Sequence, residues 1–544
     1  MTSVLAPRRT RHRQPSDHPW HGTAKMLRIA VRTGYLGLAT WPLMMAALVW
    51  FTADGVKGLY PDDASLLVYQ ATVGASPASM AFNGRGYNLD GLGGITAYEV
   101  GFFGLLLLPI VAAHLAIRHT RAQEDAGRVD LVTAASIGRL APLLGAMLAA
   151  TGALLATGLI TAALLVSTGL SVTGSSYYAL ALVLHMLVFA GVGLLAGQLA
   201  QPARGGYALT FAVIGSCYVV RAIIDGRGWP VTWLTPMGWL AEVRAFGDVQ
   251  LWPYIAFAVL FLALFAAALA ACWMRDLDAG LVAPRPGPAA GSARLRGPLG
   301  LLWRITRGMV YGWSAGAAAW GFALGLLSEE TGKLLDSNPG LAQVFGGSTT
   351  KPQELMTSVA GVVVALLACA VALQGLVRLA AEESSGRLGL VLASRYGRSR
   401  WWLTSMGLLA VEVLAVLFAG GLGYGLGAAM TTGRADQIQA GLSAAVAYYP
   451  ATLLVAMIGG ALLAVSSRLV ILAWVLFLWA AIVAMLADTL QLPGWLRNLS
   501  PLQHTGRVPV ADLNITAVVV MCLLTVVFLA FSTGWLRRRD LAAG

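Results

Sequence analysis

The chain has 544 residues, of which 58% are hydrophobic and only 11% charged, and its formal net charge is +12. A soluble protein of this composition would expose large apolar patches to water, which excludes a set of soluble globular domains. All four cysteines lie inside apolar runs, which excludes a disulfide framework and a cysteine metal site.

Basic residues dominate the start of the chain, before any long apolar run. Residues 1–20 carry four arginines among proline and serine, and we predict a disordered basic cytoplasmic arm there. The stretch Lys25–Arg32 then mixes bases with apolar residues at helical spacing. This pattern predicts a short amphipathic helix that lies in the membrane interface.

Twelve apolar runs follow, and most have the length that a helix needs to cross a bilayer. The first six lie at 34–52, 98–117, 141–168, 177–199, 206–224 and 252–274. Residues 275–300 are rich in proline, glycine and alanine, which predicts a cytoplasmic linker. The last six runs lie at 309–327, 355–377, 402–429, 441–466, 468–487 and 514–535. We therefore predict an all-α polytopic membrane protein with two six-helix halves, 21–274 and 301–544.

The two halves repeat each other in sequence. Thr235–Pro236 precedes the sixth run as Ser500–Pro501 precedes the twelfth, and Arg275–Leu277 follows the sixth as Arg539–Leu541 follows the twelfth. Matches at a nearly fixed separation indicate an internal duplication. Halves with an even number of spans point the same way, so we expect a pseudo-twofold axis normal to the membrane.

The distribution of basic residues predicts the topology. With the N-terminus inside, the inner segments hold 27 of the 37 lysines and arginines, and the outer loops hold nine. Because basic residues stay on the cytoplasmic side, we predict that both termini are cytoplasmic and that the protein is a multi-pass protein of the plasma (inner) membrane. The positive charge therefore reports topology, and no nucleic-acid partner is expected.

A charged segment is repeated between the second and third runs of each half. Glu124–Arg139 and Glu383–Arg398 are identical at eight of 16 positions, namely the Glu, both Gly-Arg pairs, the Leu-Val and an Ala. Apolar residues at helical spacing predict a helix at about 123–138 and another at about 382–397. The alternative is an ordinary charged loop that only fixes topology. The repetition favours a segment shaped to fit a partner.

This pattern of Glu-x-x-Gly-Arg-x-x-Leu-Val after a second span resembles the coupling helix of ABC-2 type exporter permeases. The doubled form, with Arg-Asp-Leu closing each half, resembles the actinobacterial polyketide-antibiotic (tetronasin-type) ABC transporter permeases. The resemblance implies that a separate ATPase subunit docks on each segment, two copies per chain. It implies two contact sets: Glu124, Gly127, Arg128 and Leu131, and Glu383, Gly386, Arg387 and Leu390.

The sequence has no phosphate-binding Gly-x-x-x-x-Gly-Lys-[Ser/Thr] motif. The chain is therefore expected to have no enzymatic activity and no cofactor of its own. ATP and Mg²⁺ are expected on the partner ATPase, and no metal site is predicted.

Aromatic residues gather in spans two, five and eleven, and the resemblance implies that the second and fifth spans of each half line a central cavity. Such a wall would suit bulky amphipathic substrates. The alternative is that these residues face lipid or pack between helices. The candidates are Phe102, Phe103, Phe211, Tyr218, Trp474, Phe477 and Trp479.

The function predicted from these features is ATP-driven export of hydrophobic or amphipathic compounds, such as antibiotics or drugs. The alternative is a secondary multidrug transporter driven by an ion gradient, for which Glu412, deep in a span, is the candidate coupling residue. A membrane enzyme or scaffold is a third reading, but it leaves the repeat unexplained. The sequence does not identify the substrate.

Overall fold

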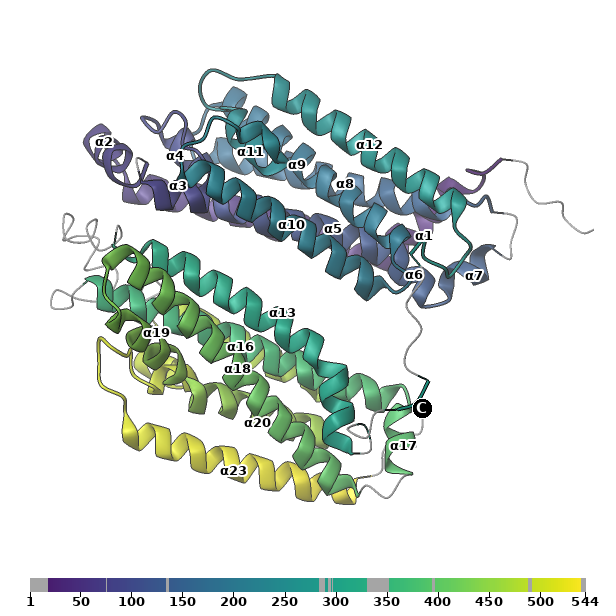
Figure 1. The fold of residues 1–544 in the computed structure, drawn as a ribbon, viewed down its shortest axis with the longest axis vertical. Helices are drawn as coiled ribbons and strands as arrows, with labels where there is room; N and C mark the ends of the chain where they lie inside the picture. Colours follow the sequence, from purple (N-terminus) through teal and green to yellow (C-terminus); the bar gives the residue numbers. More distant parts are fainter. Residues whose placement is uncertain are drawn as a thin grey trace, which may run out of the picture. The chain divides into compact units, whose positions relative to one another are not determined.

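The structure is a computed structural model that describes residues 18–74, 76–133, 137–282, 289–291, 295, 297–329, 352–393, 397–487 and 492–539. Most of the predicted arm 1–20, much of the predicted linker and the end of the chain from Asp540 onward lie outside these residues. Among the described residues the regular structure is helical, apart from one isolated β-bridge between Ala200 and Val282 (Figure 1).

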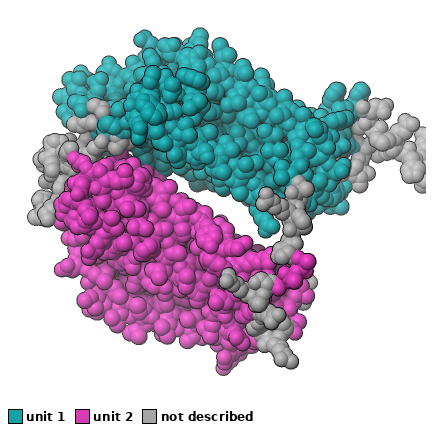
Figure 2. Space-filling model, in the orientation of Figure 1, with its two compact units in different colours: residues 1–287 teal, residues 288–544 magenta. Residues whose placement is uncertain are grey.

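The chain divides into two compact units, which Figure 2 shows in separate colours. Unit 1 comprises residues 1–287 and unit 2 comprises residues 288–544.

Unit 1 contains twelve named α-helices among its described residues. They are α1 (Thr23–Leu59), α2 (Asp63–Tyr69), α3 (Pro77–Asn83), α4 (Leu92–Glu99), α5 (Leu108–His119), α6 (Arg121–Asp125), α7 (Arg128–Thr133), α8 (Ala141–Ser167), α9 (Val172–Leu199), α10 (Ala203–Gly226), α11 (Pro236–Glu242) and α12 (Trp252–Met274). Two short π-helices, η1 (Gln70–Gly74) and η2 (Phe103–Leu107), and the 3-10 turn η3 (Thr232–Leu234) complete it.

Unit 2 repeats this order with fewer short helices between its described ranges. Its helices are α13 (Pro298–Leu326), α16 (Pro352–Ser384), α17 (Arg387–Leu392), α18 (Arg398–Thr432), α19 (Asp436–Val446), α20 (Tyr449–Val465), α21 (Val470–Leu486), α22 (Gly494–Arg497) and α23 (Ile515–Arg538). Its 3-10 turns are η5 (Ser467–Leu469) and η6 (Pro501–His504). The repeated Pro236 and Pro501 both stand at the first position of their element, where a missing N–H costs nothing.

Eleven helices in the described ranges are long and apolar enough to cross a membrane. This confirms the predicted all-α polytopic fold. The remaining predicted span, 309–327, falls on α13, which has 29 residues but is not among the eleven.

The start of α1 differs from the prediction of a separate amphipathic helix at Lys25–Arg32, and the start of α13 is built in the same way. Each is one continuous helix, from Thr23 to Leu59 and from Pro298 to Leu326. Gly34 and Pro42 of α1 and Gly308 of α13 lie within these helices and do not end them, so each helix continues into the apolar part.

One central helix in each unit organises the packing. In unit 1, α9 packs against α5, α8, α10 and α12, and in unit 2, α20 packs against α16, α18, α21 and α23. Fully buried side chains such as Leu194 and Val455 lie on these central helices. The duplication seen in the sequence is therefore a duplication of helix packing.

The first helix of each unit packs along the helix that follows the charged segment: α1 on α8, and α13 on α18. Glycines permit a very close approach of α13 and α18. A Cβ placed on Gly321 would lie 2.2 Å from the carbonyl oxygen of Gly420, and one on Gly325 would lie 2.2 Å from that of Tyr424. Small residues at such crossings let helix backbones touch, which is the main source of packing energy in a bilayer.

Candidate functional site

The repeated charged segments form short helices that begin after a glycine. In unit 1, α6 ends at Asp125, Gly127 takes a left-handed backbone with φ +66°, and α7 begins at Arg128. In unit 2, α16 runs through Ser384, and Gly386 has φ +73° before α17. Only glycine adopts this conformation at little cost.

This break corrects the helix expected over 123–138 and its copy over 382–397. The glutamate stands in the last turn before the glycine, and the arginine starts the next helix. The remainder of each predicted helix includes residues 134–136 and 394–396, which lie outside the described residues.

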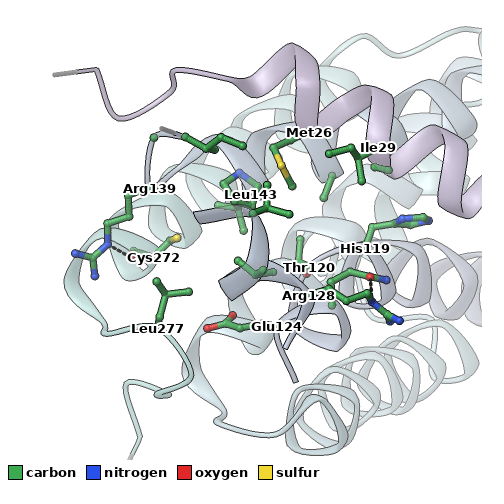
Figure 3. Close-up of a pocket in the computed structure, with 18 of the residues that line it drawn as sticks. Met26, Ile29, His119, Thr120, Glu124, Arg128, Arg139, Leu143, Cys272 and Leu277 are labelled. Atoms are coloured by element: carbon green, nitrogen blue, oxygen red, sulfur yellow. Dashed lines mark hydrogen bonds between the residues drawn. The ribbon is translucent and has the colours of Figure 1, made fainter. Parts of the chain in front are cut away.

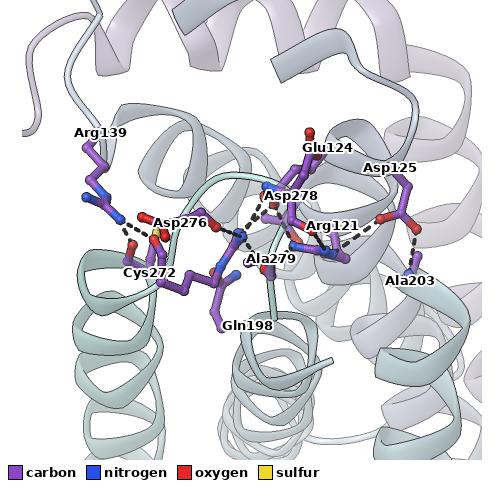
Figure 4. Close-up of polar contacts among 12 residues, drawn as sticks. Arg121, Glu124, Asp125, Arg139, Gln198, Ala203, Cys272, Asp276, Asp278 and Ala279 are labelled. Carbon is purple, nitrogen blue, oxygen red and sulfur yellow. Dashed lines mark hydrogen bonds and ion pairs between the residues drawn. The ribbon is translucent and has the colours of Figure 1, made fainter. Parts of the chain in front are cut away.

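Glu124 is buried, with 5% of its surface exposed, and holds the end of α12. Its two carboxylate oxygens each accept a hydrogen bond of 2.5 Å from the guanidinium of Arg275 (Figure 4). Arg121 lies 3.1 Å from the same carboxylate, and the backbone N–H of Asp278 donates to it at 2.8 Å. These contacts fill both carboxylate oxygens, so Glu124 points into the unit.

Arg275, just after the end of α12, is the partner of Glu124 and makes several further contacts. It also donates to the Gln198 side chain at 2.7 Å and to the carbonyl oxygen of Ala279 at 2.9 Å. Burial acts to lower the pKa of Arg275, but the hydrogen bonds and charge of Glu124 outweigh it and hold this pKa above its usual value. Arg275 therefore stays charged, and the pair is a fixed ionic joint.

Arg139 makes a second connection to the same end of α12. Its guanidinium donates to the carbonyl oxygen of Cys272 at 3.3 Å and to that of Arg275. The last carbonyl groups of a helix have no partner within it, and they carry the negative end of the helix dipole. Arg139 therefore caps the C-terminus of α12.

Unit 2 repeats both connections at matching positions. Glu383, 6% exposed, forms an ion pair with Arg539 at the end of α23. Arg398 donates to the carbonyl oxygen of Leu536 at 3.5 Å and to that of Arg539 at 2.7 Å. Glu383 and Arg398 each stand 259 positions after Glu124 and Arg139. We call each Glu–Arg ion pair, together with its capping arginine, the clamp of that unit.

The clamps account for two of the repeated features, the glutamate and the second Gly-Arg pair. Both bind within their own unit, to the last helix. Arg121, Arg275 and Arg539 were not singled out by the sequence analysis as site residues. The Arg-Asp-Leu repeat at the end of each half could have pointed to Arg275 and Arg539. In both halves this arginine is repeated, as is the glutamate that it binds.

The first Gly-Arg pair and the leucine after it behave differently, because they face outward. Leu131 and Leu390, at matching positions, are each 78% exposed. Arg128 donates a hydrogen bond of 2.7 Å to the Gln123 side chain, and Arg387 forms an ion pair with Glu382 at 2.9 Å. We call Arg128 with Leu131, and Arg387 with Leu390, the presented faces.

The neighbouring Asp125 ties the segment of unit 1 to a third helix. Its carboxylate accepts a hydrogen bond of 2.6 Å from the backbone N–H of Ala203, the first residue of α10, and lies 3.3 Å from Arg121. A carboxylate at a helix N-terminus is stabilised by the unpaired N–H groups there. The segment thus joins α5, α10 and α12.

The predicted cavity aromatics form separate groups. In unit 1, Phe102 stacks on Phe82 with ring centres 4.4 Å apart and contacts Phe103 and Tyr218 edge-on. Phe211 packs instead near Tyr207.

In unit 2, Trp474 and Phe477 lie edge to face at 5.7 Å, and Trp479 is half-buried on the same helix, α21. Whether these groups line a substrate path stays a prediction, since each unit is defined by itself.

A pocket of about 1020 Å³ opens beside the clamp of unit 1 (Figure 3). It lies between the first turns of α1, the end of α5, the charged segment and the end of α12. Glu124, Arg128 and Arg139 contribute to its wall.

Two comparisons with known proteins bear on this arrangement. Residues 295–537 match a family model described as the C-terminal domain of the multidrug efflux system permease Rv1217c. The whole chain is similar to the multidrug efflux system permease protein Rv1217c of Mycobacterium tuberculosis (strain ATCC 25618 / H37Rv). The two are 31% identical over 545 residues, which cover 97% of each chain.

Proposed function

Because the chain belongs to the family of the multidrug efflux system permease Rv1217c, we propose that it is the membrane subunit of an ABC-2 type exporter. Family membership and the apolar spans make it a multi-pass permease of the cell membrane. The proposal adds the tetronasin-type subfamily, α13 as a further span that brings the total to twelve, and a separate ATPase as the source of energy.

The observation that carries the proposal is the pairing of a presented face with a clamp in each unit. An exposed arginine and leucine stand on a helix of six residues, too short to be stable alone. The buried glutamate a few positions earlier fixes the base of that helix to the end of a long span. A force applied to such a face is transmitted rather than absorbed by a flexible loop.

The proposed mechanism follows this connection. Two copies of the ATPase bind the presented faces on the cytoplasmic side, one at Leu131 and one at Leu390. When ATP binding closes the ATPase pair, the short helices move, and the clamps carry the motion into α12 and α23. Each unit then rotates as a body, which alternates access between inside and outside.

ATP and Mg²⁺ belong to the ATPase in this scheme, because the permease sequence offers no phosphate-binding loop. The substrate is proposed to be a hydrophobic or amphipathic compound, in keeping with the aromatic side chains on the second and fifth spans. Such compounds are recognised by area and stacking more than by a fixed charge pattern.

Co-purification with the ATPase tests the proposal. We expect Arg128→Ala with Arg387→Ala to weaken ATPase binding by about tenfold, as loss of an interface arginine does. Arg204→Ala is the matched control, since Arg204 is also exposed and stands next to the residue that Asp125 contacts. Unchanged ATPase binding and unchanged export in the double variant would rule the docking assignment out.

A further inference from the structure

We propose that the pocket of unit 1 binds an anionic phospholipid, with its headgroup at Arg118 and its acyl chains along α1. The inference concerns a ligand of the permease itself and does not rest on the proposed ATPase docking. It comes from the chemistry of the pocket wall, which Figure 3 shows between α1 and the charged segment.

The pocket has one apolar side. Met26, Ile29, Ala30 and Thr33 recur at helical spacing, so one face of α1 lines it. Leu143 of α8 lies beside Met26 in the same wall (Figure 3). At about 1020 Å³ the pocket is far larger than an inorganic anion needs and lies at the upper end of small-molecule sites.

The other side of the pocket is basic. Arg118, Arg128 and Arg139 line it, whereas Glu124 is already neutralised by Arg275. Asp276 is the remaining acidic residue in the lining. An excess of positive charge beside an apolar wall matches an anionic group carried on hydrocarbon chains.

Two polar groups in this wall lack a protein partner. Arg118 is exposed, and among the described residues its guanidinium forms no hydrogen bond or ion pair. His119 is only 7% exposed, yet its Nε2 has no hydrogen-bond partner there. Unsatisfied buried nitrogen is costly, and a headgroup oxygen would satisfy it.

The position of α1 favours a lipid over a soluble anion. Lys25, Arg28 and Arg32 are exposed on the helix face that does not line the pocket. Basic residues at the cytoplasmic end of a span are attracted to an anionic membrane surface, and basic pockets between spans bind lipid headgroups. A phospholipid would thus reach the pocket directly from the leaflet.

Photo-crosslinking of the purified full-length chain tests the inference. The probe is phosphatidylglycerol with a diazirine on one acyl chain, and labelled peptides are mapped by mass spectrometry. We expect labels on peptides from the first turns of α1 and from α8, and competition by unlabelled phosphatidylglycerol.

Two variants with matched controls sharpen the test. Arg118→Gln should weaken binding about fivefold, the effect of one basic residue near an anionic headgroup, whereas Arg204→Gln should not. Ile29→Trp fills the pocket and should abolish labelling. Val31→Trp changes a side chain of similar exposure, 44% against 41%, outside the pocket and should leave labelling intact.

Other outcomes would overturn the inference. Equal competition by phosphatidylcholine would mean a non-specific lipid shell. Competition by glycerol 3-phosphate alone would assign the site to a free anion. Labelling that is unchanged in Arg118→Gln and Ile29→Trp would place the lipid elsewhere.

Discussion

Glu124 and Arg275 join the charged segment of unit 1 to the end of α12 through two contacts of 2.5 Å, across 151 positions of sequence. Glu383 and Arg539 form the same joint in unit 2. A duplicated buried ion pair of this kind makes the charged segment part of the helix bundle. The substitutions below test this joint, the short helix α17, the packing of the helices and the role of Glu412.

Removal of one partner of the joint should be costly. We expect Glu124→Ala to lower the free energy of unfolding by about 3–5 kcal/mol, because Arg275 is left buried and charged. Thermal unfolding of the purified permease in detergent measures this. The double variant Glu124→Gln with Arg275→Gln should recover part of the loss, and a melting temperature unchanged in Glu124→Ala would contradict the joint.

Alanine substitution of Gly386, just before α17, and of Gly389, within α17, should change the stability of this helix in opposite directions. Gly386→Ala places a Cβ on a left-handed backbone and should cost about 1–2 kcal/mol locally. Gly389→Ala adds a methyl group in open space within the helix and should stabilise it by up to about 1 kcal/mol. Hydrogen exchange of the amides in 387–392 should speed up in the first variant and slow down in the second.

Among the glycines of α13, Gly325 touches α18 and should not accept a larger side chain, whereas Gly316 should accept one. Gly325→Val should lower the free energy of unfolding by about 1–3 kcal/mol, since its Cβ would strike the backbone of Tyr424. Gly316→Val on the same helix meets nothing within 4 Å and serves as the control. Equal melting temperatures for the two variants would show that the helices are not in contact.

Glu412 separates ATP-driven export from ion-coupled transport. The side chain is 1% exposed in α18, and its Oε1 has no hydrogen-bond partner among the described residues. We expect Glu412→Gln to keep ATP-driven uptake of a fluorescent amphipathic dye into inside-out vesicles. Loss of uptake with intact ATPase stimulation would favour the ion-gradient alternative instead.

Much of the fold follows from the sequence, because apolar run length and internal repetition are local signals. The runs at 141–168 and 252–274 became α8 and α12 within a few residues. The contacts within the site are harder to predict from local sequence signals. Helical spacing cannot reveal that Glu124 turns inward, since its partner Arg275 is distant in sequence and its burial depends on that partner. The exposure of Leu131 fits its expected place in a contact set, but that expectation came from the family resemblance and not from helical spacing.

The two presented faces are alike in shape but not in charge. Arg128 contacts a neutral Gln123, whereas Arg387 contacts the anionic Glu382 at the matching position. The Arg387 face therefore has an ion pair at its base, whereas the Arg128 face has a neutral hydrogen bond there and the acidic Asp130 on its helix. Two identical ATPase subunits would therefore bind two different surfaces on this chain, so we expect one presented face to be occupied before the other. Because both halves lie in one polypeptide, the difference between the two presented faces is encoded in a single gene. One presented face can also be mutated while the other, in the same molecule, stays unchanged for comparison.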